Sequence, residues 1–263
     1  MFWQRVVTIL VGMPIVLAAG YAGGPALLAL VLLLAALVGW EVADMVRHRG
    51  GLGFRWVYMV GGVLLPLALW VGGRHWTEAA LVALVALSVY LLVLESSRRG
   101  VDLVPLFGTV LGLWVTIYMG WALGILLELR RLSFAALLAG LLIPWAHDIF
   151  AYVVGKTLGH RPLVPLISPG KTVEGTVAGV AASTAVMVIL APKLGVPVAW
   201  AVPIGLVAGG AAALGDLGES VLKRAFQVKD AGSLLPGHGG IFDRFDSFLV
   251  AVPFIYLVLR IWA

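Results

Sequence analysis

The chain alternates long apolar stretches with short breaks that are charged or rich in glycine and proline. A helix needs about 20 mostly apolar residues to cross the hydrocarbon core of a bilayer. Nine stretches approach that length, near residues 5–20, 25–40, 56–72, 78–95, 103–127, 133–154, 172–192, 197–214 and 247–262. The fifth is long and carries Gly120 in its second half, which predicts a tilted or broken helix. The pattern therefore predicts an all-α polytopic transmembrane helical bundle with about nine spans.

Composition narrows the class of protein further. Hydrophobic residues make up 62% of the chain and charged residues 12%, against about 45–50% and about 25% in an average soluble domain. This excludes a soluble globular enzyme and a disordered chain. The absence of cysteine excludes disulfides, thiolate metal sites and cysteine nucleophiles. No basic run stands clear of the apolar stretches, so no nucleic-acid partner is predicted.

The N-terminus resembles a signal peptide, because Arg5 precedes an apolar run that ends in Ala18-Ala19-Gly20. Further spans follow at once, which favours an uncleaved first span. Cytoplasmic loops of membrane proteins carry an excess of Lys and Arg. With the N-terminus inside, 13 of the 18 Lys and Arg residues fall on the inner side and five on the outer side. This predicts an N-in, C-out topology, with Arg130-Arg131 as a local exception, and places residues 147–171 and 215–246 together on the cytoplasmic side.

The segment Gly215–Asp246 holds five of the 13 acidic and four of the 18 basic residues. Ionisable clusters at membrane depth are functional candidates, although a solvated loop is the alternative. Asp243 and Asp246 are three apart and share a face if helical. Together with Asp216 they offer the oxygen ligands that Mg²⁺ prefers. The alternative is local ion pairing worth about 0.2–0.5 kcal/mol per pair, and for Glu219 with Lys223 that reading is equally good.

Basic residues in the same segment supply positive charge for phosphate oxygens. The candidates are Lys223, Arg224, Lys229 and Arg244. Snorkelling to lipid headgroups is the alternative, and for Lys229 it explains the residue nearly as well. The glycine-rich turn at residues 236–240 contains His238, which either donates to phosphate or caps the turn.

A second polar cluster lies upstream. Ser168 followed by Pro169 is a helix-start pattern, which places Lys171 in the first turn beside N–H groups that favour anions. The sequence therefore predicts a phosphate site there. A P-loop is excluded, because that motif needs glycine where Pro165 stands.

Three acidic residues stand at the ends of apolar stretches. Asp148 is a candidate metal ligand, or else a buried acid paired with Lys156 or Lys171. Glu41 and Glu95 are expected to be salt-bridged or to face lipid.

Together the polar positions resemble the signature of bacterial phosphatidate cytidylyltransferases (CDP-diacylglycerol synthases). The downstream positions are Ser220, Lys223, Arg224, Lys229, Asp230, Pro236, His238, Gly239, Gly240, Asp243, Arg244 and Asp246, and the upstream positions are Ser168, Pro169, Lys171, Thr172, Glu174 and Gly175. The resemblance divides the chain into scaffold spans (residues 1–132) and a catalytic region (residues 133–263).

The resemblance implies an integral membrane enzyme that makes CDP-diacylglycerol and pyrophosphate from phosphatidic acid and CTP. It implies catalytic roles for Asp216, Lys223, Asp243 and Asp246. It implies metal binding by Asp216, Asp243 and Asp246, to which we add Asp148 as a further candidate ligand. It implies substrate binding by Ser168, Lys171, Thr172, Ser220, Arg224, Lys229, His238 and Arg244.

The cofactor expected from the resemblance is Mg²⁺, and a second cation stays open. The expected partners are CTP, phosphatidic acid in the leaflet and the bilayer itself, without nucleic acid. A homodimer is the assembly considered, in the bacterial inner membrane with the site facing the cytoplasm.

Two other functions compete with this one. An alcohol phosphatidyltransferase is disfavoured, because its pattern of an Asp-Gly pair followed by Ala-Arg and spaced aspartates is not found. A secondary transporter also carries polar residues at broken helices, but no paired inverted halves are visible in the sequence.

Overall fold

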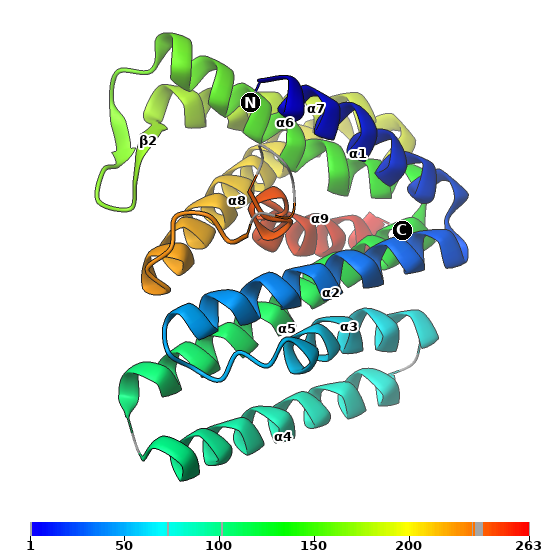
Figure 1. The fold of residues 1–263 in the computed structure, drawn as a ribbon. Coiled ribbons are helices and arrows are strands. Elements are labelled where there is room, and N and C mark those ends of the chain that lie inside the picture. The colour runs from blue at the N-terminus through cyan, green and yellow to red at the C-terminus, as the bar shows by residue number, and fades with distance from the viewer. Residues whose placement is uncertain (1, 73, 101, 233, 235–238, 263) are drawn as a thin grey trace. The chain divides into compact units, whose positions relative to one another are not determined.

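The computed structural model describes residues 2–72, 74–100, 102–232, 234 and 239–262 (Figure 1). Its elements are α1 (Phe2–Ala22), α2 (Gly24–His48), α3 (Arg55–Val71), α4 (Arg74–Arg99), α5 (Leu103–Leu132), α6 (Phe134–Leu158), β1 (Pro162–Val164), β2 (Ser168–Thr172), α7 (Val173–Leu194), α8 (Val198–Ala225), the 3₁₀ turn η1 (Phe242–Arg244) and α9 (Phe248–Trp262). The predicted all-α class is confirmed.

Length and hydropathy separate the helices into two groups. Within the described residues, six helical stretches are long and apolar enough to cross a membrane, in α2, α4, α5, α6, α7 and α8. The apolar parts of α1, α3 and α9 are shorter, at 10–17 residues. The structure therefore fits a multi-pass membrane protein, and the total of nine spans and their orientation stay predictions.

The chain forms two compact units. Unit 1 contains residues 1–127 and 223–244, and unit 2 contains residues 128–222 and 245–263. The last turn of α8 thus belongs to unit 1. Whether the scaffold and the catalytic region divide at residue 132 stays a prediction.

Unit 1 is built on helices packed at close range. α3 lies between α2 and α4 (Figure 1), and Leu65, Ala68 and Leu84 form a buried cluster with α5 residues against it. Glycine permits this approach: a Cβ on Gly39 would lie 2.5 Å from the Tyr58 carbonyl oxygen. Small residues at helix contacts are typical of packing in bilayers.

The helix α5 runs without a break to Leu132, so the expectation of a broken fifth span is wrong. At Gly120, a Cβ would overlap the carbonyl oxygen of Gly62 in α3. The glycine therefore serves close packing of α5 on α3 and does not interrupt the helix.

Unit 2 pairs α6 with α7, packs α9 on α6, and carries a β-hairpin at the ends of α6 and α7 (Figure 1). Strands β1 and β2 are antiparallel, with Pro162 opposite Thr172 and Val164 opposite Ser168. A Cβ on Gly175 would lie 2.5 Å from the Ala151 carbonyl oxygen, so α7 begins in close contact with α6. This packing places the end of β2 beside α6 and α7.

Candidate active site

The polar residues of unit 2 depend on the length of α8. The apolar pattern ends near Leu214, but the helix continues to Ala225. Asp216, Glu219 and Ser220 therefore lie on one helical face, because residues three and four apart are neighbours on a helix surface. The predicted span end at residue 214 was a boundary of polarity and not the end of the helix.

Three carboxylates gather at this face. One oxygen each from Asp216, Glu219 and Asp246 lies within 4.8 Å of the other two. Glu219 is 1% exposed. Burial raises the pKa of Asp246, and the neighbouring carboxylates raise it further. Like charges this close repel one another, so the cluster is suited to hold a cation.

Lys171 joins the upstream cluster to the downstream one. Its Nζ lies 2.6 Å from Asp216 Oδ1 and donates to Ser220 Oγ at 3.1 Å. Ser220 Oγ in turn donates to the backbone carbonyl of Asp216 at 3.1 Å. The two segments that resemble family motifs are thus in direct contact, although 45 positions separate Lys171 from Asp216.

Asp148 approaches the cluster through Ser247. The buried Ser247 hydroxyl donates to Asp148 Oδ2 at 2.7 Å, and the Ser247 amide donates to Asp246 Oδ1 at 2.7 Å. Asp148 thus contacts Ser247, a partner that the sequence reading did not consider. Its role as a metal ligand stays a prediction.

The predicted helix start at Ser168 is wrong. Residues Ser168–Thr172 form β2, and α7 begins at Val173 with Thr172 as its N-cap, whose Oγ1 accepts from the Gly175 amide at 3.2 Å. Lys171 therefore precedes the cap and does not lie in the first turn. Pairing with β1 keeps Ser168 extended, and Thr172 has the hydroxyl that an N-cap requires.

The remaining candidates belong to unit 1. Lys223 Nζ donates to Asp243 Oδ1 at 2.8 Å, and their side chains are 15% and 6% exposed. Arg224 is exposed and donates to the Val228 carbonyl at 3.4 Å. Lys229 and Arg244 are exposed. His238 lies outside the described residues.

Asp243 and the three clustered carboxylates belong to different units. Within unit 1, Asp243 accepts from Lys223 and from two backbone amides, those of Ala231 and Gly240. Its predicted metal-binding role stays a prediction.

Glu219 is the residue that sequence reasoning left undecided. Its spacing of four from Lys223 suggested an ion pair, which stays a prediction, and the structure gives Lys223 an ion pair with Asp243. The informative signal was the spacing of three from Asp216 on a helix that continues past the apolar stretch.

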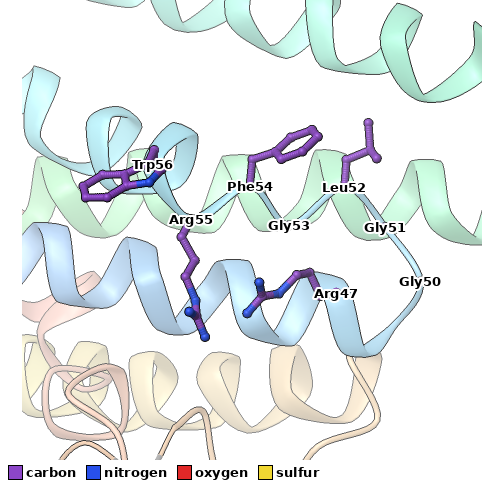
Figure 2. A pocket seen from close by; sticks show the side chains of 8 residues that line it. All are labelled: Arg47, Gly50, Gly51, Leu52, Gly53, Phe54, Arg55 and Trp56. Atoms are coloured by element: carbon purple, nitrogen blue, oxygen red, sulfur yellow. The ribbon is translucent and has the colours of Figure 1, made fainter. Parts of the chain in front are cut away.

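A cavity of about 580 Å³ lies elsewhere in unit 1, at the α2–α3 loop. Figure 2 shows Arg47 and Arg55 on one side of this loop, with Leu52 and Phe54 pointing to the other. Both arginines pair with Asp44, and the Arg55 guanidinium also lies 4.1 Å from the centre of the Trp40 ring. These charged side chains pair with one another around the loop, and the carboxylate cluster stays the candidate active site.

Comparison with known proteins gives a consistent result. The model of the cytidylyltransferase family matches residues 3–262. A phosphatidate cytidylyltransferase of Bacillus subtilis is 42% identical over 152 residues, which cover 56% of this chain and 56% of that protein. One of Staphylococcus saprophyticus is 35% identical over 203 residues, covering 75% and 76%. One of Brucella abortus is 32% identical over 222 residues, covering 83% and 70%.

Proposed function

The chain belongs to the cytidylyltransferase family, and from this we propose that it makes CDP-diacylglycerol and pyrophosphate from phosphatidic acid and CTP. The family predicted from the sequence motifs is confirmed, and the enzyme class agrees with the names of the relatives. The aligned region spans about half of the Bacillus subtilis relative and more than two thirds of the other two. Helices long enough to cross a bilayer suit an enzyme whose acceptor is a lipid.

The observation that carries the proposal is the carboxylate cluster of Asp216, Glu219 and Asp246 with Lys171 attached. In this reaction a phosphate oxygen of phosphatidic acid forms a bond to the α-phosphorus of CTP, and the bond to pyrophosphate breaks. Both reactants are anions, so positive charge must stabilise the attacking and leaving oxygens. No side chain has to remove a proton, because phosphatidic acid is already ionised near neutral pH.

The cluster fits a hard divalent cation, because its ligands are all carboxylate oxygens. We propose Mg²⁺ held by Asp216, Glu219 and Asp246, with Asp148 and Asp243 as further candidate ligands and a second cation left open. When bound, the cation would neutralise phosphate charge in the transition state.

The basic side chains are proposed to bind phosphate groups. Lys171 is the best placed, since its ammonium group contacts both Asp216 of the carboxylate cluster and Ser220. Ser168 and Thr172 border it on β2. From unit 1, Lys223, Arg224, Lys229 and Arg244 are proposed to bind the nucleotide or the lipid phosphate, as is His238. Thr172 also has a structural role as the cap of α7.

The protein is a multi-pass membrane protein, and its bacterial relatives indicate the inner membrane. We place the site on the cytoplasmic face, where CTP is available, in agreement with the excess of Lys and Arg in the loops on that side. A homodimer is the proposed assembly.

The test is pyrophosphate release by the purified protein in detergent, with phosphatidic acid, CTP and Mg²⁺ each omitted in turn. We expect release only when all three are present, and a loss of at least 100-fold for Asp246→Asn. Asp102→Asn is the matched control, because Asp102 is exposed and caps the Val104 amide, which Asn also does. Undiminished Mg²⁺-dependent release by Asp246→Asn would refute the metal assignment. Flux across sealed vesicles without pyrophosphate release would favour a transporter.

A further inference from the structure

Glu41 is a buried acid that takes no part in the carboxylate cluster. It lies in α2 of unit 1 and is 2% exposed. A carboxylate in such a place is costly unless it is hydrogen-bonded. The expectation that it faces lipid is wrong, and its described hydrogen bonds are to backbone amides about 200 positions away in the sequence.

Each oxygen of Glu41 accepts one backbone hydrogen bond. Oε1 accepts from the Ile241 amide at 2.9 Å, and Oε2 accepts from the Phe242 amide at 2.9 Å. A buried acceptor that loses its donor carries the full cost of desolvation. Glu41 therefore fixes the backbone at the start of η1.

Two glycines close around the same carboxylate. A Cβ on Gly232 would lie 2.6 Å from Glu41 Oε1, and a Cβ on Gly240 would lie 2.5 Å from Oε2. Real Cβ atoms do not approach an oxygen this closely. The described residues 226–232 and 239–244 between α8 and α9 (the α8–α9 loop) thus lie around the Glu41 carboxylate, and a Cβ at Gly232 or Gly240 would displace it.

A second carboxylate organises the loop from within. Asp243 Oδ2 accepts from the amides of Ala231 and Gly240 at 3.1 and 2.8 Å, and Lys223 donates to its Oδ1. Gly240 therefore contacts Asp243 through its amide while it lies against Glu41. Any displacement of the loop from α2 would therefore also displace Asp243 and its partner Lys223.

We propose that Glu41 is a positioning residue that holds the α8–α9 loop on α2 and so sets Asp243 and Lys223 for the reaction. This inference rests on the proposed function. It gives unit 1 a part in positioning Asp243 and Lys223, beyond that of a scaffold. Glu41 acts through the loop backbone and does not touch the substrate.

The test compares Glu41→Gln with Glu95→Gln. Glutamine has the same shape as glutamate. Its NH₂ group, however, would face a backbone N–H at the place where a carboxylate oxygen accepts a hydrogen bond. Glu95 is the matched control, since it is also buried in unit 1, at 1% exposure, and accepts from Thr109 of α5. We expect a fall in kcat of at least tenfold for Glu41→Gln and less than twofold for Glu95→Gln, with both melting temperatures close to the parent.

Hydrogen exchange gives a readout that does not depend on activity. We expect about tenfold faster exchange in the peptide covering residues 239–244 of Glu41→Gln, with unchanged exchange in the helices. A loop that keeps its protection, or exchange that rises equally throughout the protein, overturns the proposal. If the parent protein releases no pyrophosphate, the proposed function fails, while the exchange result still decides whether Glu41 holds the loop.

A third variant tests the contact itself. Gly232→Ala forces a Cβ against Glu41 Oε1 and is expected to lower kcat about as much as Glu41→Gln. Because both changes disturb one contact, the double variant is expected to lose little more than either single variant. Full multiplication of the two losses would show that the residues act separately and would overturn the proposal.

Discussion

Gly215 controls how closely α8 approaches the segment that carries Asp246. A Cβ at this position would lie 2.6 Å from the Asp246 carbonyl oxygen and 3.2 Å from the Ser247 Cα. Both neighbours are backbone atoms, which cannot rotate away. We therefore predict that Gly215→Ala separates Asp246 from Asp216, the residue next to Gly215 in α8.

The size of the effect follows from the overlap. An ordinary contact begins at 3.4 Å, so the segment must move by about 0.8 Å, and misplacement of a reacting group by about 1 Å costs up to about 10²-fold in rate. Alanine in a helix gains about 1 kcal/mol over glycine, while overpacking costs about 1–3 kcal/mol. The net cost in stability is therefore about 0–2 kcal/mol. We expect a 10- to 100-fold slower release of pyrophosphate from a protein that unfolds within a few degrees of the parent.

Gly218→Ala is the matched control on the same helix. A Cβ at Gly218 would meet no atom within 4 Å, so the variant is expected to keep full activity and to gain up to about 1 kcal/mol in stability. Both variants are assayed for pyrophosphate release over a range of Mg²⁺ concentrations and for thermal unfolding in detergent. Equal activity of Gly215→Ala and Gly218→Ala would refute the reasoning, because the contact with Asp246 would then have no effect on the site.

Two further predictions concern the ammonium group of Lys171 and the packing of unit 1. Lys171→Met removes the ammonium group 2.6 Å from Asp216 and is expected to lower kcat/KM for CTP at least tenfold. Lys171→Arg is expected to recover part of this loss. An unchanged kcat/KM in Lys171→Met would exclude Lys171 from phosphate binding. Gly120→Ala, which drives a Cβ into the Gly62 carbonyl, is expected to lower unfolding stability by about 1–3 kcal/mol, whereas Gly210→Ala, with nothing within 4 Å, is expected to be neutral or stabilising. Thermal unfolding of the two variants compares them directly.

Apolar length predicted the helices well, because a bilayer leaves few other ways to satisfy the backbone. The third apolar stretch was expected at residues 56–72 and forms the helix Arg55–Val71, and the last was expected at 247–262 and forms the helix Phe248–Trp262. The pattern failed where a helix leaves the apolar region. Hydropathy records where polar residues begin, while the backbone hydrogen bonds of α8 continue to Ala225.

Only part of the candidate site could be predicted from the sequence. Asp216 and Asp246 were predicted from their number and spacing, and the structure places them together with Glu219. Lys223 contacts Asp243, which is 20 positions away and which local spacing could not indicate. Glu41 was beyond reach for the same reason, since its partners are backbone amides that no side-chain pattern reveals.

The β2 strand shows how one short segment serves two elements. Successive side chains of a strand point to opposite faces, so Thr172 and Lys171 are directed apart. The Thr172 hydroxyl caps α7 by accepting from Gly175, while Lys171 reaches Asp216 and Ser220 on α8. Had the helix begun at Ser168, both side chains would lie on a helical turn, only 100° apart and tied to the axis of α7. Because β2 is extended, Thr172 caps α7 while the Lys171 ammonium group contacts α8.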